Sequence, residues 1–158
     1  MPIEIRLAVT VRRPRPEVAQ VLFDPSFDTE WIAGLTAATV TPLGLLRAGS
    51  TVVRRFADRR REVVDEQTVV EAEDGRILVV QRSRPFPQIL GFELERTPEG
   101  TLLRVHLVGV VPGLRRVLSP WLRWRLRRAL LQDLWALKDF VEARSEAAAV
   151  MARLPADD

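Results

Sequence analysis

One aspartate within the apolar face of a long C-terminal helical segment is the residue of this chain best placed to do chemistry. Asp133 lies among leucines that recur every three or four residues between Leu118 and Val141, and no residue three or four positions away can pair with it. An unpaired buried carboxylate is costly. Asp133 therefore forms a structural salt bridge to a sheet arginine, lines a ligand cavity, or lies at a different helical phase. In an enzyme it would be the candidate catalytic acid or base.

Two arginines are the candidate partners of this carboxylate. Arg54 and Arg82 each alternate with apolar residues in a candidate β-strand, and we take both arginines to share the inward face of their strands. Each would then project toward the mouth of a cavity and pair with Asp133, or bind a carboxylate or phenolate of a ligand. The alternative is that both side chains reach solvent at the edge of the sheet.

Other common catalytic and metal-binding chemistries find little support in the sequence. His106 is the only histidine, and it is out of phase with Val105 and Leu107, which places it on the solvent face of its strand. One histidine without any cysteine does not make the usual nitrogen and sulfur ligand set of zinc. No phosphate-binding loop or dinucleotide-type glycine motif is present. We therefore predict no metal and no cofactor.

The composition bounds the class of protein. A chain of 158 residues with 47% hydrophobic residues fits one globular domain. It has no run of about 18 apolar residues and no signal-like N-terminus, and the absence of cysteine makes a cytoplasmic location the default expectation. The 24 basic residues face 21 acidic ones, a balance that argues against nucleic acid as a partner.

The order of elements predicts an α+β fold. Strict alternation over residues 3–11 indicates a half-buried strand, and a helix led by Pro16 and a second short helix over residues 27–33 follow. Turn-like separators then delimit six strands with short connections, which favour antiparallel pairing. Ser119 and Pro120 are expected to open the long terminal helix as its N-cap and first residue. The six strands are expected at residues 36–42, 49–57, 61–72, 76–84, 88–97 and 101–111.

Alternation also predicts which strand faces point inward. The apolar sets of the last two strands are taken as inward, as is the set that contains Arg54. In residues 61–72 both phases carry charge, so the inward face of that strand is left open. The inward sets are Val52, Arg54 and Phe56; Leu78, Val80, Arg82 and Arg84; Leu90, Phe92 and Leu94; and Leu103, Val105 and Leu107.

These residues resemble a known superfamily. The segment PRPEVAQVLFDPSFDTEWIAGL, residues 14–35, is similar to the opening signature of START-like (SRPBCC) proteins, in particular of their polyketide cyclase/dehydrase and lipid-transport branch. Pro16, Val18, the pair Asp24-Pro25 and Trp31 carry the likeness, together with Gly49 and the terminal segment DLWALKDFVEAR. The resemblance implies a helix-grip fold, in which a curved antiparallel sheet of about seven strands wraps a long terminal helix. It also implies one domain over residues 1–148, with residues 149–158 as a flexible or helical tail.

The resemblance implies a cavity for a hydrophobic or amphipathic small molecule, such as a lipid, a polyketide or an isoprenoid. Binding of such a molecule is the function that we expect. The alternative is a cyclase, aromatase or dehydratase in which Asp133 acts with Arg54 or Arg82. Trp31 is expected to anchor the core or to line the cavity entrance. The candidate ligand-binding residues are Trp31, Arg54, Phe56, Arg82, Phe92, Leu94, Leu130, Asp133, Leu134 and Leu137.

A second alternative arises from the arginine- and tryptophan-rich part of the terminal helix. The segment RWRLRRALL, residues 123–131, is expected to form a solvated arginine fringe. A narrower stripe of Trp124, Leu131 and Trp135 is either covered by the short helices or exposed. If it is exposed, it suggests a homodimer, another protein partner or a peripheral membrane contact.

Overall fold

The computed structural model describes residues 2–81 and 86–154. One strand, two short helices, six strands and a long helix follow one another, as the sequence predicts. The bounds are β1 Pro2–Val11, α1 Arg15–Leu22, a 3-10 turn Pro25–Phe27, α2 Asp28–Trp31, β2 Leu35–Thr41, β3 Thr51–Asp58, β4 Arg61–Glu73, β5 Arg76–Gln81, β6 Gln88–Thr97, β7 Gly100–Val110, a 3-10 segment Gly113–Leu118 and α3 Ser119–Arg153.

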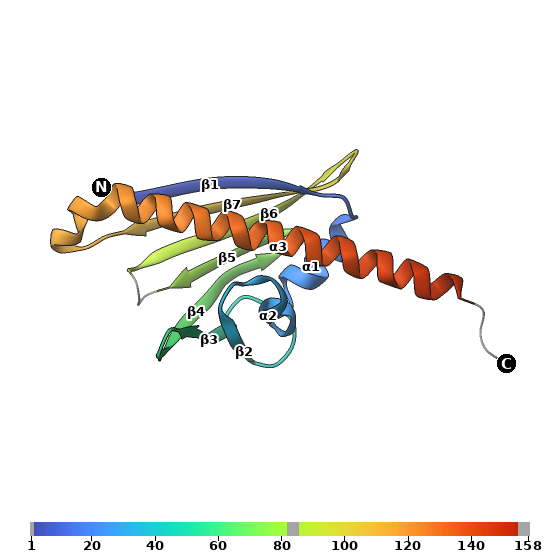
Figure 1. Ribbon diagram of the computed structural model, residues 1–158, viewed down its shortest axis with the longest axis horizontal. Coiled ribbons are helices and arrows are strands. Elements are labelled where there is room, and N and C mark those ends of the chain that lie inside the picture. The colour runs from blue at the N-terminus through green and yellow to red at the C-terminus, as the bar shows by residue number, and fades with distance from the viewer. Residues whose placement is uncertain (1, 82–85, 155–158) are drawn as a thin grey trace.

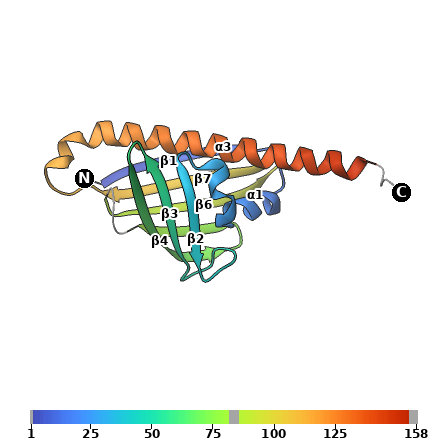
Figure 2. The same cartoon turned by 60° about the horizontal axis from the view of Figure 1, so that its bottom comes forward.

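The strands form one antiparallel sheet of seven in the order β1-β7-β6-β5-β4-β3-β2. The register shifts in β2 between Leu35 and Ala37, and in β4 between Val69 and Glu71. Such irregularities bend strands and increase their twist. Strands β2, β3 and β4 accordingly run across the direction of β1 and β7, while α3 spans the concave side of the sheet (Figures 1 and 2). This arrangement is the helix-grip α+β fold that the sequence predicts.

Two groups of buried side chains hold the sheet and helices together. In the first, the odd-numbered residues of β1 from Ile3 to Val11 pack with β7, α1 and the buried face of α3. Leu94 and Leu137 belong to this packed group. The second group is smaller and lies on β3, β4 and β5, around Val52, Val69 and Ile77. Packing between α3 and the sheet is therefore concentrated on the β1 and β7 side.

The inward face of β5 differs from the sequence prediction. Ile77, Val79 and Gln81 are buried, whereas Leu78 and Val80 are only partly buried. Both phases of this strand are apolar, so alternation could not identify the buried one. Arg82 and Arg84, predicted on the same inward face as Leu78, lie outside the described residues.

The beginning of the long helix also differs in detail. Ser119 is the first helical residue, and Leu118 occupies the N-cap position without a side-chain hydrogen bond. The 3-10 segment Gly113–Leu118 leads directly into α3, which removes the extended residue that a serine cap requires. At its other end α3 continues to Arg153.

Candidate functional site

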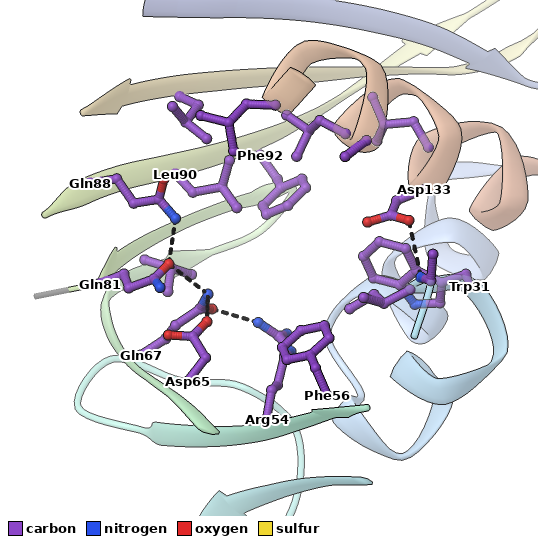
Figure 3. A pocket seen from close by; sticks show the side chains of 18 of the residues that line it. Trp31, Arg54, Phe56, Asp65, Gln67, Gln81, Gln88, Leu90, Phe92 and Asp133 are labelled. Carbon is purple, nitrogen blue, oxygen red and sulfur yellow. Dashed lines mark hydrogen bonds between the residues drawn. The ribbon is translucent and has the colours of Figure 1, made fainter. Parts of the chain in front are cut away.

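A cavity of about 820 Å³ lies between the sheet and α3 (Figure 3). Its size falls in the range of small-molecule sites, roughly 300–1,000 Å³. The side of the cavity opposite the sheet is formed by one stretch of α3 that includes Leu126, Leu130 and Leu134. The cavity residues that sequence analysis named are Trp31, Arg54, Phe56, Phe92, Leu130, Asp133 and Leu134.

Three of the named residues are not placed at the cavity. Leu94 and Leu137 are buried in the packed group between β1, β7 and α3. They point inward as predicted, but they contact other core side chains and do not line the cavity. Arg82 lies outside the described residues.

A row of three glutamines crosses the sheet wall of the cavity. Gln67, Gln81 and Gln88 are cross-strand partners on β4, β5 and β6. The amide nitrogens of Gln88 and Gln67 both donate to the side-chain oxygen of Gln81, the second over 3.5 Å. Gln67 is 7% exposed and Gln81 is 5% exposed. The register of three neighbouring strands thus places a continuous polar band on an apolar sheet face (Figure 3).

The glutamine row was not predicted from the sequence. Alternation leaves the inward face of residues 61–72 open, and it favours the other phase of β5. In the structure Gln67 and Gln81 each lie two residues from a buried valine of the same strand, Val69 and Val79, but the sequence alone did not identify these valines as the buried ones.

On the β3 side of the row, Gln67 contacts Arg54, which forms a buried ion pair with Asp28. Arg54 donates from Nη2 and Nε to Oδ2 of Asp28, at 2.7 and 3.0 Å, and from Nη1 to Oε1 of Gln67 at 2.5 Å. The Asp28 side chain is 1% exposed. Burial raises the pKa of Asp28, and the charge and hydrogen bonds of Arg54 oppose that rise. The sheet arginine named from the sequence is therefore paired with Asp28 of α2, which the sequence did not single out.

Asp133 faces the cavity from α3. Its Oδ1 accepts a hydrogen bond from the backbone N–H of Ala33 at 3.1 Å, and it makes no ion pair with any described residue. Desolvation raises the pKa of Asp133 to about 6, against the opposing effects of the Ala33 N–H and the Arg54 charge. The structural salt bridge to a sheet arginine is thus absent from the described part of the chain.

A second carboxylate lies on the sheet wall. Asp65 of β4 accepts a hydrogen bond from Gln67 Nε2 on its Oδ2 at 3.0 Å. Burial is the largest influence on it and raises its pKa, while Gln67 and Arg54 act in the opposite direction. Among the described residues, Oδ1 of Asp65, Oε1 of Gln88 and Nε1 of Trp31 are buried without a hydrogen-bond partner. These three polar atoms belong to residues that line the cavity.

Apolar residues form most of the remaining wall. Ile77, Val79, Leu90, Phe92 and Leu107 line the sheet side, next to the polar row. Trp31 is 7% exposed and both packs in the core and lines the cavity, so its two expected roles coincide. The cavity therefore joins a polar band with an apolar surface.

The outer face of α3 carries exposed aromatic rings. Trp121, Trp124 and Trp135 are 50–56% exposed, and Arg125 and Arg128 stack over Trp121 and Trp124 at 5.4 and 5.6 Å. Leu131, expected in the same stripe, instead packs against the core. The stripe is exposed only at its tryptophans, and a homodimer or membrane contact stays a prediction.

Three further expectations concern His106, metal binding and membrane-spanning helices. His106 lies on the exposed face of β7 as predicted, and its Nε2 is 2.8 Å from Glu4 Oε1. In residues 2–81 and 86–154, no group of three or more histidine, aspartate or glutamate side chains is arranged to hold a metal ion. No helix in the same ranges is long and apolar enough to cross a membrane.

Comparison with known proteins identifies the fold. No protein-family model and no curated protein sequence matches the chain. Solved structures do match. Protein NE0264 from Nitrosomonas europaea is 15% identical with a TM-score of 0.75, covering 91% of this chain and 97% of that one. TTHA0849 from Thermus thermophilus is 16% identical with a TM-score of 0.74, covering 90% of this chain and 99% of that one.

A further match is the di-domain ARO/CYC StfQ from the steffimycin biosynthetic pathway. It is 12% identical with a TM-score of 0.77, over 92% of this chain and 52% of that one. The chain thus spans about half the length of this di-domain protein. At such identities the comparisons establish the fold alone, which is the helix-grip fold that the resemblance to START-like proteins implies.

Proposed function

We propose, from the START-like helix-grip fold that this chain has, that the protein binds a hydrophobic or amphipathic small molecule between its sheet and α3. Lipids, polyketides and isoprenoids have the required size and character. The observation that carries the proposal is the cavity of about 820 Å³, with the glutamine row along one part of its wall and Leu90, Phe92 and Leu107 beside it. Mostly apolar walls with a few placed polar groups are typical of small-molecule sites.

A fluorescence titration tests this proposal. N-phenyl-1-naphthylamine is an uncharged probe that emits strongly when it leaves water for an apolar site. We expect saturable binding of one probe per chain, and about tenfold weaker binding to the variant Leu90→Glu, because a carboxylate would enter the apolar wall.

Ile89→Glu is the matched control. Ile89 precedes Leu90 in β6, is 45% exposed and is absent from the cavity wall, so it should leave the affinity unchanged. Circular dichroism must show that both variants are folded at the temperature of the titration. No saturable binding to the wild-type protein, or equal losses in both variants, would refute the proposal.

A second candidate function is that of a cyclase, aromatase or dehydratase on a polyketide-like substrate. The observation that favours it is the placement of Asp133, which lines the cavity and has a pKa raised to about 6, near the range where general acids and bases work best. The di-domain ARO/CYC StfQ shares the fold.

The test of this second function is turnover of a poly-β-keto thioester, followed by the absorbance of an aromatic product. Asp133→Asn should abolish the catalysed rate and retain binding of N-phenyl-1-naphthylamine. A wild-type rate equal to the uncatalysed rate, or an Asp133→Asn variant that is fully active, would exclude this role for Asp133.

A further inference from the structure

Among the described residues, the charges around the cavity are unequal in sign. One guanidinium, that of Arg54, interacts electrostatically with three carboxylates, those of Asp28, Asp65 and Asp133. Asp28 forms the direct ion pair with Arg54 and balances its charge. Asp65 and Asp133 remain as two carboxylates on the cavity wall without an ion pair to a described residue. Asp58 and Arg125, which are exposed and also line the cavity, contribute one charge of each sign.

Arg54 is also committed as a hydrogen-bond donor. Each of its three guanidinium nitrogens already donates to Asp28 or to Gln67. An anionic ligand that approached Arg54 would have to compete with the buried carboxylate of Asp28, while the carboxylates of Asp65 and Asp133 would repel it. Of the two arginines expected to bind a carboxylate, Arg54 is thus already paired with Asp28, and Arg82 lies outside the described residues.

The polar wall includes one oxygen acceptor that no described residue satisfies. Oδ2 of Asp133, on the cavity wall, accepts no hydrogen bond from a described residue, whereas Oδ1 of Asp65 and Oε1 of Gln88 are buried beneath the wall surface. Trp31 Nε1 is the one unpartnered buried donor among the described residues of the wall. Leaving buried acceptors unsatisfied is unfavourable. A ligand that brings a hydroxyl or amine group would donate to Oδ2 of Asp133.

We infer that the ligand is an apolar molecule that carries hydroxyl or amine donors and no negative charge, and that molecules with a carboxylate or phosphate head are excluded. This inference rests on the proposed binding function and specifies its ligand class. Selection against anions comes from the charges of Asp65 and Asp133, and selection for a donor comes from Oδ2 of Asp133. Discrimination of this kind combines an attractive and a repulsive element.

Three naphthalenes with different heads test the inference by titration calorimetry at about pH 8, where carboxyl groups are ionised and 2-naphthol is neutral. We expect 2-naphthol to bind about fivefold tighter than 2-methoxynaphthalene, which lacks the donor. It should bind at least about tenfold tighter than 2-naphthoate, which carries the charge.

Two cavity variants and one surface variant complete the experiment. Asp65→Asn and Asp133→Asn should each strengthen the binding of 2-naphthoate by about threefold or more, since each removes one repelling charge. Asp139→Asn changes the net charge by the same amount at an exposed position of α3 outside the cavity, and should leave 2-naphthoate binding unchanged. If one cavity variant fails to fold, the other still decides the outcome.

The inference is overturned if 2-naphthoate binds as tightly as 2-naphthol, if 2-methoxynaphthalene matches 2-naphthol, or if 2-naphthol does not bind while N-phenyl-1-naphthylamine does. It is also overturned if Asp139→Asn strengthens 2-naphthoate binding as much as the cavity variants do. Failure of N-phenyl-1-naphthylamine itself to bind would instead remove the proposed function. The inferred ligand class and the proposed binding function can therefore be refuted separately.

Discussion

Asp133 bears on both the stability of the fold and the proposed function of the cavity. The helical pattern identified it as the polar residue of an apolar face, and the structure places it at the cavity with a single hydrogen bond from the Ala33 backbone. Sequence alone could not choose between a salt bridge and a cavity wall, because that choice depends on where Arg54 points. Arg54 is held by Asp28, which lies 26 residues away in the chain, and such a pairing leaves no periodic signal.

The raised pKa of Asp133 has a consequence for stability. The pKa rises from an ordinary value of 3.8 to about 6 in the folded protein. Between these two values the unfolded carboxyl is ionised while the folded one keeps its proton, so the free energy of unfolding decreases as pH rises from about 4 to about 6. Asp133→Asn removes this effect and keeps an oxygen that can accept from Ala33.

We therefore expect the unfolding temperature of Asp133→Asn, relative to wild type, to increase by a few degrees between about pH 4 and about pH 6, and then to stay level. Thermal unfolding followed by circular dichroism at a series of pH values measures this, with Asp139→Asn as the exposed control on the same helix. A difference that does not change across the window would show that Asp133 is not desolvated.

Arg54 and Asp28 form the buried ion pair of the site. Removing the arginine leaves the carboxylate of Asp28, 1% exposed, without its partner, so we expect Arg54→Leu to cost about 3–5 kcal/mol in the free energy of unfolding. The double variant Arg54→Leu/Asp28→Leu should recover most of that loss, because it leaves no unpaired charge. Urea denaturation measures both. A loss below about 1 kcal/mol in the single variant would contradict the pairing.

At the scale of the elements, prediction succeeded where one face of a strand is solvated and failed where both faces are apolar. β1 alternates between exposed and buried residues along its whole length, and its inward face was predicted correctly, as were those of β6 and β7. β5 carries Ile77 and Val79 on one face and Leu78 and Val80 on the other, so its phase was not readable. The glutamine row was therefore not predicted either, because Gln67, Gln81 and Gln88 become neighbours only through the pairing of β4, β5 and β6.

The β6–β7 end of the sheet offers a test of the packing. At Gly109 of β7 a Cβ atom would lie 2.2 Å from the ring of Phe86, which is 2% exposed. At Gly91 of β6 a Cβ would make an ordinary contact of 3.5 Å with Leu78. We expect Gly109→Ala to destabilise the protein by about 1–3 kcal/mol, because the ring must move.

Gly91→Ala is the control for this prediction, and it should be neutral or stabilising by up to about 1 kcal/mol, since alanine loses less conformational entropy on folding than glycine does. Urea denaturation of the two variants gives the comparison. Equal losses at the two positions would contradict the placement of Phe86 against Gly109.

At the scale of the whole molecule, the curved sheet and α3 pack together on the β1 and β7 side (Figure 1), and the cavity lies toward β3, β4 and β5 (Figure 3). Element order and alternation predicted the α+β class, the antiparallel strands and the long terminal helix, because each strand and helix is encoded locally. The helix-grip arrangement and its cavity were expected from the resemblance to START-like proteins. The detailed wall was not predictable, because Asp28, Gln67 and Gln81 acquire their roles only through contacts between elements. Binding within this space is the central claim, and adsorption on the exposed tryptophans of α3 is its competitor.

The four tryptophans of the chain allow binding in the cavity and adsorption on α3 to be distinguished by one measurement. In a ¹⁵N–¹H correlation spectrum each indole N–H gives its own signal, and single tryptophan-to-phenylalanine variants assign them. Trp31 lines the cavity, while Trp121, Trp124 and Trp135 lie exposed on α3. On titration with N-phenyl-1-naphthylamine we expect the Trp31 signal to shift and saturate at one probe per chain while the other three stay in place. Shifts of Trp121 and Trp124 with an unmoved Trp31 would contradict binding in the cavity.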